Sequence, residues 1–257
     1  MLYIDQPVQV GFSYTSLVNS TLDIFSNAIA PVDPQNPVQA DAMHLAGVLP
    51  DQNMNFTANN TQNSARTLWH FAQTWFTEFP EYNTTDKHIS VWGNSYGGYY
   101  VPGTVAYFQE QNERIKNGTI DTPNAVHLEL DTLGITNGCI DALVSGLAWP
   151  DYAFNNTYGF QGIPEDVYHD AVNNFTKPGG CKDLTLRCRE LGAIGDPMES
   201  GSNDTVNAAC ALATEYCWTY VQGPFVALSG VSSLSYHGLV VVLTSASVAL
   251  STSLVMH

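Results

Sequence analysis

Positive charge is scarce in this sequence. Its 257 residues include eight Lys and Arg against 24 Asp and Glu, which gives a formal net charge of −16. A protein this acidic repels nucleic-acid phosphates and anionic lipid surfaces, so nucleic acid is excluded as a partner. The hydrophobic fraction of 44% still suffices for a sizeable core, and the length suits one large or two small domains.

Three further signals are missing. No C-x2-C pair is accompanied by a matching histidine, so we predict no zinc and no other metal. No apolar run reaches the roughly 18–20 residues of a membrane-spanning helix, so no membrane attachment is expected. The chain begins MLYIDQPV, with neither a basic stretch nor a long apolar stretch, and we recognise no signal peptide there.

Sequons and cysteines nevertheless indicate the secretory route, with an extracellular or vacuolar destination. Because N-x-[ST] occurs eight times, we predict N-glycosylation at Asn19, Asn55, Asn59, Asn83, Asn117, Asn155, Asn174 and Asn203. An Asn- and Thr-rich surface without glycans is the alternative. Four of the five cysteines lie within residues 181–217, which favours disulfides in a loop-rich insert. Cys139 is either a free buried thiol or half of a bridge whose partner lies outside this chain.

Hydrophobic periodicity divides the chain into three parts, 1–149, 150–223 and 224–257. The first part predicts, in order, a strand at 1–5, mostly loop over 15–62, a helix from Asn63 to Pro80, a strand at 88–92, a helix to Asn117 and a strand through 126–138. This alternation predicts a parallel sheet with helices on its faces. The second part predicts short helices such as PEDVYHDAVNNF between turns, and the third is an apolar tail rich in Ser and Thr.

One pentapeptide carries chemistry. Gly93-Asn94-Ser95-Tyr96-Gly97 fits G-x-S-x-G and lies between a predicted strand and a predicted helix, which is the context of a nucleophile elbow. Strained dihedrals there lift the serine hydroxyl above the sheet, and Gly93, Gly97 and Gly98 let the flanking backbones pass closely. The Tyr96 amide at the helix start is then one oxyanion donor. A Gly-rich loop that serves only helix–strand packing is the alternative.

Four segments together resemble the serine carboxypeptidases, and filamentous-fungal members most. They are MLYIDQPVQVGFSY, NSARTLWHFAQTWFTEFPEY, GNSYGGYYVPG and GITNGCID, in the order of that family. The resemblance covers about residues 1–230. It implies an α/β fold, namely a partial α/β-hydrolase parallel sheet with a helical, disulfide-bearing insert. It also implies hydrolysis of C-terminal peptide bonds through an acyl-serine at Ser95, with peptide or protein C-termini as substrates and no cofactor.

The resemblance also assigns a substrate-binding residue. Asn94 falls where the family usually has a Glu that helps to hold the terminal carboxylate of the substrate. An asparagine amide can donate to a carboxylate without being protonated, so we expect substrate binding to depend less on pH in the acid range.

Several family elements are missing from this chain. The upstream W-L-N-G-G-P-G segment, the catalytic Asp and the histidine motif have no counterpart, so we expect a chain cut at both ends with little or no activity. His127 is expected to lie within a strand, with either a packed core role or an edge role, and His169 to be solvated. His237 and His257 match nothing in the histidine motif. Asp141 is expected to cap or form a turn, and Asp5 to be a structural hydrogen-bonding residue.

The resemblance stops after VQGPFVALSG. From about residue 231 we interpret the sequence as a translated intron or a missed exon, with a lipid-anchor signal as the rival interpretation. Two other functions stay open. One is a non-catalytic secreted glycoprotein on a hydrolase scaffold, and the other is a carboxypeptidase-like acyltransferase or esterase.

Overall fold

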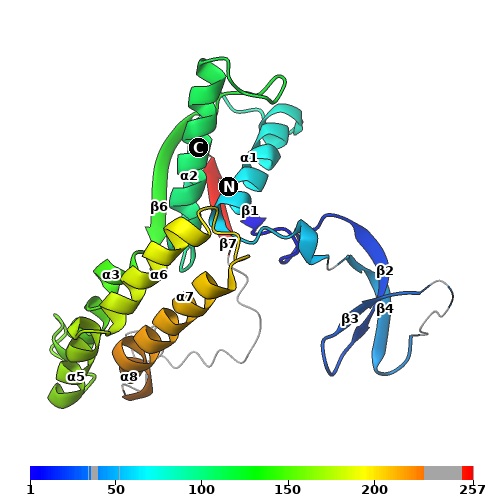
Figure 1. The fold of residues 1–257 in the computed structure, drawn as a ribbon. Helices are drawn as coiled ribbons and strands as arrows, with labels where there is room; N and C mark the ends of the chain where they lie inside the picture. The colour runs from blue at the N-terminus through cyan, green and yellow to red at the C-terminus, as the bar shows by residue number, and fades with distance from the viewer. Residues whose placement is uncertain (34, 36–39, 52, 229–250, 257) are drawn as a thin grey trace. The chain divides into compact units, whose positions relative to one another are not determined.

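The computed structural model describes residues 1–33, 35, 40–51, 53–228 and 251–256. These residues form two compact units (Figure 1): Met1–Gly138 with the C-terminal strand, and the described residues from Cys139 to Leu228. The units divide after Gly138, and the boundary expected after residue 149 stays a prediction. None of the helices in the described ranges is long and apolar enough to cross a membrane.

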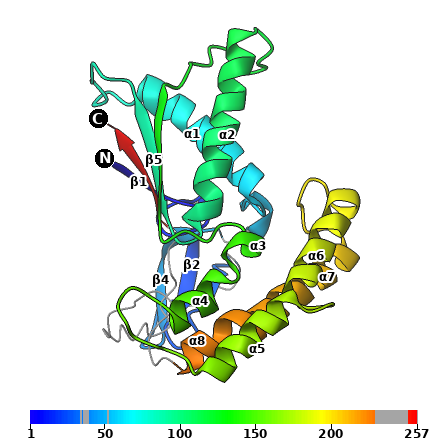
Figure 2. The ribbon, with the colours of Figure 1, turned by 90° about the vertical axis from the view of Figure 1, so that its left-hand side faces the viewer.

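A four-stranded mixed sheet organises the first unit (Figure 2). Its strands lie in the order β1 (Leu2–Asp5), β7 (Ser251–Met256), β5 (Ile89–Asn94) and β6 (Leu130–Thr136). β5 and β6 are parallel, whereas β7 runs antiparallel to both β1 and β5. The three strands predicted from the sequence therefore share one direction, and the described part of the tail contributes a strand of opposite direction between them. The rest of the tail, and with it His237 and His257, lies outside the described residues.

Two amphipathic helices, α1 (Thr61–Glu78) and α2 (Gly97–Lys116), cover one face of this sheet (Figure 2). The Asn60 side chain caps α1 by accepting a hydrogen bond from the Asn63 amide at 2.7 Å. Apolar side chains from both helices and β5 form the core: Leu68, Trp69, Ala72, Val101, Phe108, Ile89 and Val91. Both helices are confirmed near their predicted bounds, because a wide apolar face at helical spacing must be buried somewhere.

Two buried amides hold the chain that enters β6. Gln73 of α1 accepts from the Val126 amide at 2.7 Å and donates to its carbonyl at 3.0 Å. Asn112 of α2 does the same for Leu128, at 2.9 and 2.7 Å. The main-chain groups of Val126 and Leu128 thus form hydrogen bonds with side chains instead of with a neighbouring strand. For this reason the strand predicted from residue 126 begins only at Leu130.

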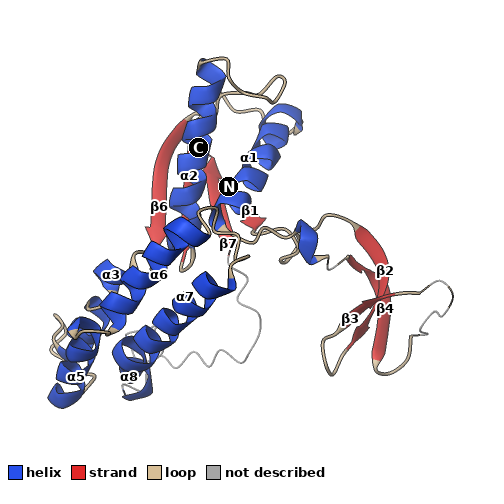
Figure 3. Cartoon of the chain, viewed as in Figure 1, coloured by secondary structure: helices blue, strands red, loops and turns tan. Residues whose placement is uncertain are grey.

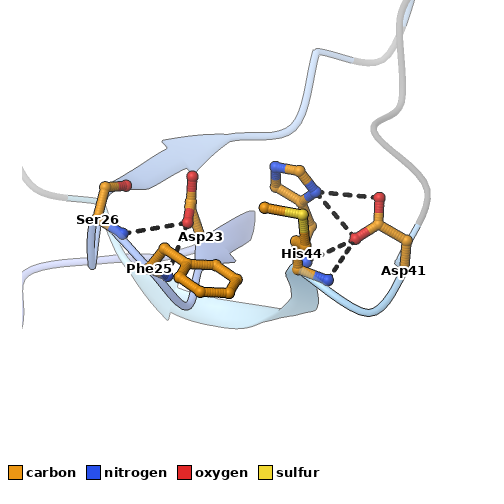
Figure 4. Close-up of polar contacts among 6 residues, drawn as sticks. Asp23, Phe25, Ser26, Asp41 and His44 are labelled. Atoms are coloured by element: carbon orange, nitrogen blue, oxygen red, sulfur yellow. Dashed lines mark hydrogen bonds and ion pairs between the residues drawn. The ribbon is translucent and has the colours of Figure 1, made fainter.

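A second, antiparallel sheet occupies the segment that we expected to be mostly loop. It contains β2 (Leu17–Asp23), β3 (Ile29–Pro31) and β4 (His44–Pro50), in the order β3-β2-β4. Two carboxylates close its turns (Figure 4). Asp23 accepts from the Phe25 amide at 2.8 Å, and Asp41 accepts from the His44 amide at 2.8 Å. The sequence prediction missed this sheet because turn chemistry and strand pairing hold it, and because its β4 side chains are mostly exposed.

The second unit is helical in its described part (Figure 3). Its elements are α3 (Ala142–Ser145), α4 (Ala148–Phe154), α5 (Glu165–Thr176), α6 (Cys181–Gly195), α7 (Asp204–Cys217), the π-helix η2 (Trp218–Gln222) and α8 (Gly223–Leu228). Disulfides Cys181–Cys217 and Cys188–Cys210 join α6 to α7, which confirms the predicted disulfide-bearing insert. Cys139 is an unpaired thiol and is exposed, so the expectation of a buried free thiol is wrong.

Candidate functional site

Ser95 lies at the turn between β5 and α2, with a φ of +57°. Its amide donates to the Thr136 carbonyl at 3.1 Å, and its own carbonyl accepts from the Gly98 amide at 3.0 Å. A non-glycine residue in the left-handed region is strained, and hydrogen bonds on both sides hold it there. The half-buried serine side chain is thus presented at the carboxyl end of a sheet strand and at the amino end of a helix.

Gly93 is the glycine that the turn requires. A Cβ at this position would lie 2.5 Å from Val101 Cγ2 and 2.9 Å from the Gly97 Cα, so any side chain would force strand and helix apart. At Gly97 a Cβ would meet nothing within 4 Å apart from the backbone of its own helix. The close approach is therefore between the Gly93 position and the Gly97 backbone, and it is Gly93 that cannot carry a side chain. Gly98 is buried in the first turn of α2.

The start of α2 offers positive potential beside the serine. Tyr96 is the N-cap residue and makes no side-chain capping bond, and the first turn contains no acidic residue. In the described part of the chain the Tyr96 amide has no hydrogen-bond acceptor. Unsatisfied amides at a helix start attract negative charge, so this end of α2 suits an oxyanion.

Aromatic rings and one amide surround this helix start. The Tyr96 ring lies 5.0 Å from the Tyr99 ring and 5.1 Å from that of Tyr100, and burial raises the pKa of Tyr100. Asn94, the last residue of β5, is exposed and lies opposite Thr136 in the β5–β6 register. An exposed amide next to the serine is available to donate to a ligand.

No histidine in the described ranges hydrogen-bonds to the Ser95 hydroxyl. His127 precedes β6 instead of lying within a strand as expected, and its half-exposed ring lies 3.3 Å from Glu129 Oε1. His169 is exposed, as predicted, and its Nε2 lies 3.6 Å from Glu165 Oε1. The described residues therefore bring the serine, the helix start and Asn94 together, without a base.

The two aspartates expected to be structural are confirmed in that role. Asp5 Oδ2 accepts from the Phe12 amide at 2.7 Å, and the Asp5 carbonyl accepts from Ser13 Oγ at 2.6 Å. Asp141 caps α3 by accepting from the Leu143 amide at 2.8 Å. Its oxygens also accept from both terminal nitrogens of Arg189, at 2.7 and 3.1 Å, and this guanidinium lowers the pKa of Asp141.

Sequence reasoning missed a cavity of about 550 Å³ in the first unit. Asp5 lines it from the end of β1, Phe12 and Tyr14 from the segment that follows, and His70 and Phe71 from α1. Burial lowers the pKa of His70. No pattern in the sequence predicted the cavity, because its walls come from two segments more than fifty positions apart. Ser95 is not among its lining residues.

A metal-assisted site is not supported by the described residues. They contain no group of three or more His, Cys, Asp or Glu side chains that could hold a metal ion.

Comparison with known proteins places these features in context. Residues 1–207 match the family model described as serine carboxypeptidase. The chain is 46% identical over 228 residues to carboxypeptidase S1 homolog A of Arthroderma otae, which covers 88% of this chain and 35% of that protein. It is 43% identical over 229 residues to a carboxypeptidase Y homolog of Arthroderma benhamiae, with 88% and 36% covered. It is 26% identical over 226 residues to carboxypeptidase S1 of Penicillium janthinellum, with 87% and 39% covered. The chain thus spans about a third of the length of these relatives.

Proposed function

The chain belongs to the serine carboxypeptidase family, and from this membership we propose that the protein releases C-terminal residues from peptides through an acyl-enzyme on Ser95. The observation that supports the proposal most is the φ of +57° at Ser95, between β5 and α2. Such a turn aims the hydroxyl away from the sheet, toward the point where the helix amides meet a substrate carbonyl.

The proposed chemistry assigns a step to each group. Ser95 Oγ attacks the carbonyl carbon of the last peptide bond, and its proton goes to a base that returns it to the leaving amine. The Tyr96 amide donates to the oxyanion of the tetrahedral intermediate. The described residues offer Ser95 no hydrogen-bonded histidine, so we propose that the 257-residue chain by itself has little or no activity.

Replacement of Ser95 by alanine tests the proposal. In the active protein, S95A is expected to lower the rate of release of the C-terminal amino acid from a blocked dipeptide by roughly 10³-fold or more, because the covalent route is lost. A fluorophosphonate probe should label the wild type and spare S95A. Unchanged peptidase activity in S95A would overturn the assignment. Formation of a new ester in place of a free amino acid would instead indicate an acyltransferase.

We further propose that Asn94 donates a hydrogen bond to the terminal carboxylate of the substrate. Since an amide does not titrate, KM should stay flat across the acid range where a carboxyl side chain would ionise. The variant Asn94→Glu should introduce a KM that rises as pH increases through the pKa of the new carboxyl group, because the ionised form repels the substrate. A KM–pH profile identical to that of the wild type would contradict this role.

The route through the cell is also a proposal. The two disulfides of the second unit support passage through an oxidising compartment, and so do the eight sequons. We propose that the protein is a glycoprotein of the secretory route.

A further inference from the structure

We infer that the eight sequons fall into two classes: Asn174 and Asn203 stay unmodified, whereas the sequons with exposed asparagines carry N-glycans. This inference goes beyond the proposed peptidase activity, although it rests on the proposed secretory route. An N-glycan is attached through the side-chain nitrogen of asparagine, so that nitrogen must face solvent in the folded protein.

Asn174 makes three side-chain hydrogen bonds inside the second unit. Its Nδ2 donates to the Asp170 carbonyl at 2.8 Å, and its Oδ1 accepts from Lys177 Nζ at 2.7 Å and from the Tyr216 hydroxyl at 3.0 Å. The residue is half-buried within α5, and the next residue, Phe175, is a core side chain that is 4% exposed. A sugar on this nitrogen would displace the contact between α5 and the end of α7. Molecules modified here therefore cannot adopt this fold.

Asn203 is equally engaged, as the N-cap of α7. Its Oδ1 accepts from the Thr205 amide at 3.1 Å and from the Val206 amide at 3.2 Å. Its Nδ2 donates to the Gly195 carbonyl at 3.1 Å. This nitrogen lies so close to the end of α6 that even a Cβ on Gly195 would come within 2.9 Å of it. A first sugar on this nitrogen would therefore have to share the space beside the end of α6.

Five other sequon asparagines present the opposite picture. Their side chains are exposed and make no side-chain hydrogen bond among the described residues: Asn19, Asn55, Asn83, Asn117 and Asn155. The sixth exposed sequon asparagine, Asn59, belongs to the same class, although its Oδ1 accepts from Asn63 Nδ2 at 2.9 Å. Asn83 lies between α1 and β5, and Asn117 follows the last turn of α2. Since β5 and the start of α2 meet at Ser95, both asparagines lie at the end of the first unit away from the serine. Glycans there leave the nucleophile accessible.

Single Thr→Ala changes at the third sequon position test the inference without touching any asparagine. The protein is expressed through a eukaryotic secretory route, and glycans are counted by mass before and after enzymatic deglycosylation. We expect Thr85→Ala and Thr157→Ala to lose one glycan each. We expect Thr176→Ala and Thr205→Ala to lose none. Thr157→Ala is the matched control, because Asn155 lies in the same unit as Asn174 and Asn203.

Peptide mapping gives a second readout that does not depend on the variants. Deglycosylation in heavy-oxygen water should convert Asn83 and Asn155 to labelled aspartate and leave Asn174 and Asn203 as asparagine. A glycan on Asn174 or Asn203 in folded, secreted protein would overturn the inference, and so would bare asparagines at all six exposed positions. Peptidase activity is measured separately, so a failure of the glycan assignment leaves the test of Ser95 intact.

Discussion

Asn112 and Gln73 are amides at positions where the helical pattern would place apolar side chains. Each follows a buried aromatic residue by four positions, Phe108 in one case and Trp69 in the other, and each is less than a tenth exposed. A polar amide four positions after a buried aromatic residue lies on the inner face of the helix, and this spacing is the sequence signal from which Gln73 and Asn112 could have been predicted as buried. A buried amide at such a position is retained where main-chain groups of another segment need a partner.

Replacing Asn112 by leucine should therefore destabilise the protein although the two side chains have the same branched arrangement of non-hydrogen atoms. The Leu128 amide and carbonyl would each lose their partner, at a cost of about 1–3 kcal/mol per group. Urea unfolding followed by far-UV circular dichroism measures the loss. Gln109→Leu, an exposed change on the same helix, is the matched control and should stay within about 0.5 kcal/mol of the wild type. Equal stability of the two variants would contradict this account.

At the scale of elements, the closure of the small β2–β3–β4 sheet depends on ionised carboxylates. Main-chain amides hold the pKa of Asp23 and that of Asp41 below the ordinary value, Phe25 being the main donor to Asp23 and Met43 to Asp41. A lowered pKa means that these bonds contribute fully above the unfolded-state pKa of about 3.9 and are lost as pH falls through the folded-state value.

We expect the amide proton shifts of Phe25 and Met43 to move as pH falls below about 5, because the carboxyls that accept from these amides gain protons. An NMR titration measures this directly. The Asp41→Asn variant should abolish the titration at Met43 and leave that at Phe25 in place. A titration midpoint above the ordinary carboxyl range would show that the pKa of the aspartate is raised and not lowered.

The α6–α7 pair depends on covalent cross-links. Removal of the Cys188–Cys210 bridge by a double serine substitution should cost about 3 kcal/mol, because the unfolded chain regains the freedom of a 22-residue separation. Thermal unfolding of the reduced and oxidised forms gives a parallel measurement. Cys139→Ser serves as the control, since this exposed thiol is unpaired. A larger loss in the control than in the double variant would refute the assignment.

The same scale explains what the sequence could predict. α1 and α2 can be predicted from hydrophobic periodicity, because a continuous apolar helix face must be buried against the rest of the protein. The position of Ser95 at a strand–helix turn can be predicted from the spacing of the glycines around it. The small sheet was missed because β4 exposes most of its side chains and thus leaves no burial pattern to detect. The bond from Ser95 to the Thr136 carbonyl joins positions 41 apart and has no local signature.

At the scale of the whole molecule, net charge and exposed apolar surface act in opposite directions. Tyr3 on β1 is 68% exposed and Trp92 on β5 is 40% exposed, whereas α1 and α2 cover the other face of the sheet. The net charge of −16 repels a second copy. Because salt shortens the Debye length from about 10 Å at 0.1 M to about 3 Å at 1 M, repulsion fades while apolar attraction persists.

The purified chain should therefore associate as ionic strength rises. Light scattering from 0.05 to 1 M salt measures this, and Tyr3→Lys should shift the onset to higher salt. A chain that stays monomeric and unfolds cooperatively at every salt concentration would contradict this prediction.

The two tethers of α2 constrain how this part of the chain can change in length. Ser95 is bound to Thr136 at one end and Asn112 to Leu128 at the other. The helical path from Ser95 to Asn112 and the strand path from Leu128 to Thr136 both measure roughly 25 Å. An inserted or deleted residue within either path would make the two lengths unequal and break one of the two hydrogen-bonded links. The stretch between Asn112 and Val126 belongs to neither path and is free of this constraint. Natural variants should accumulate insertions there, at the rim farthest from the serine, and keep both paths at constant length.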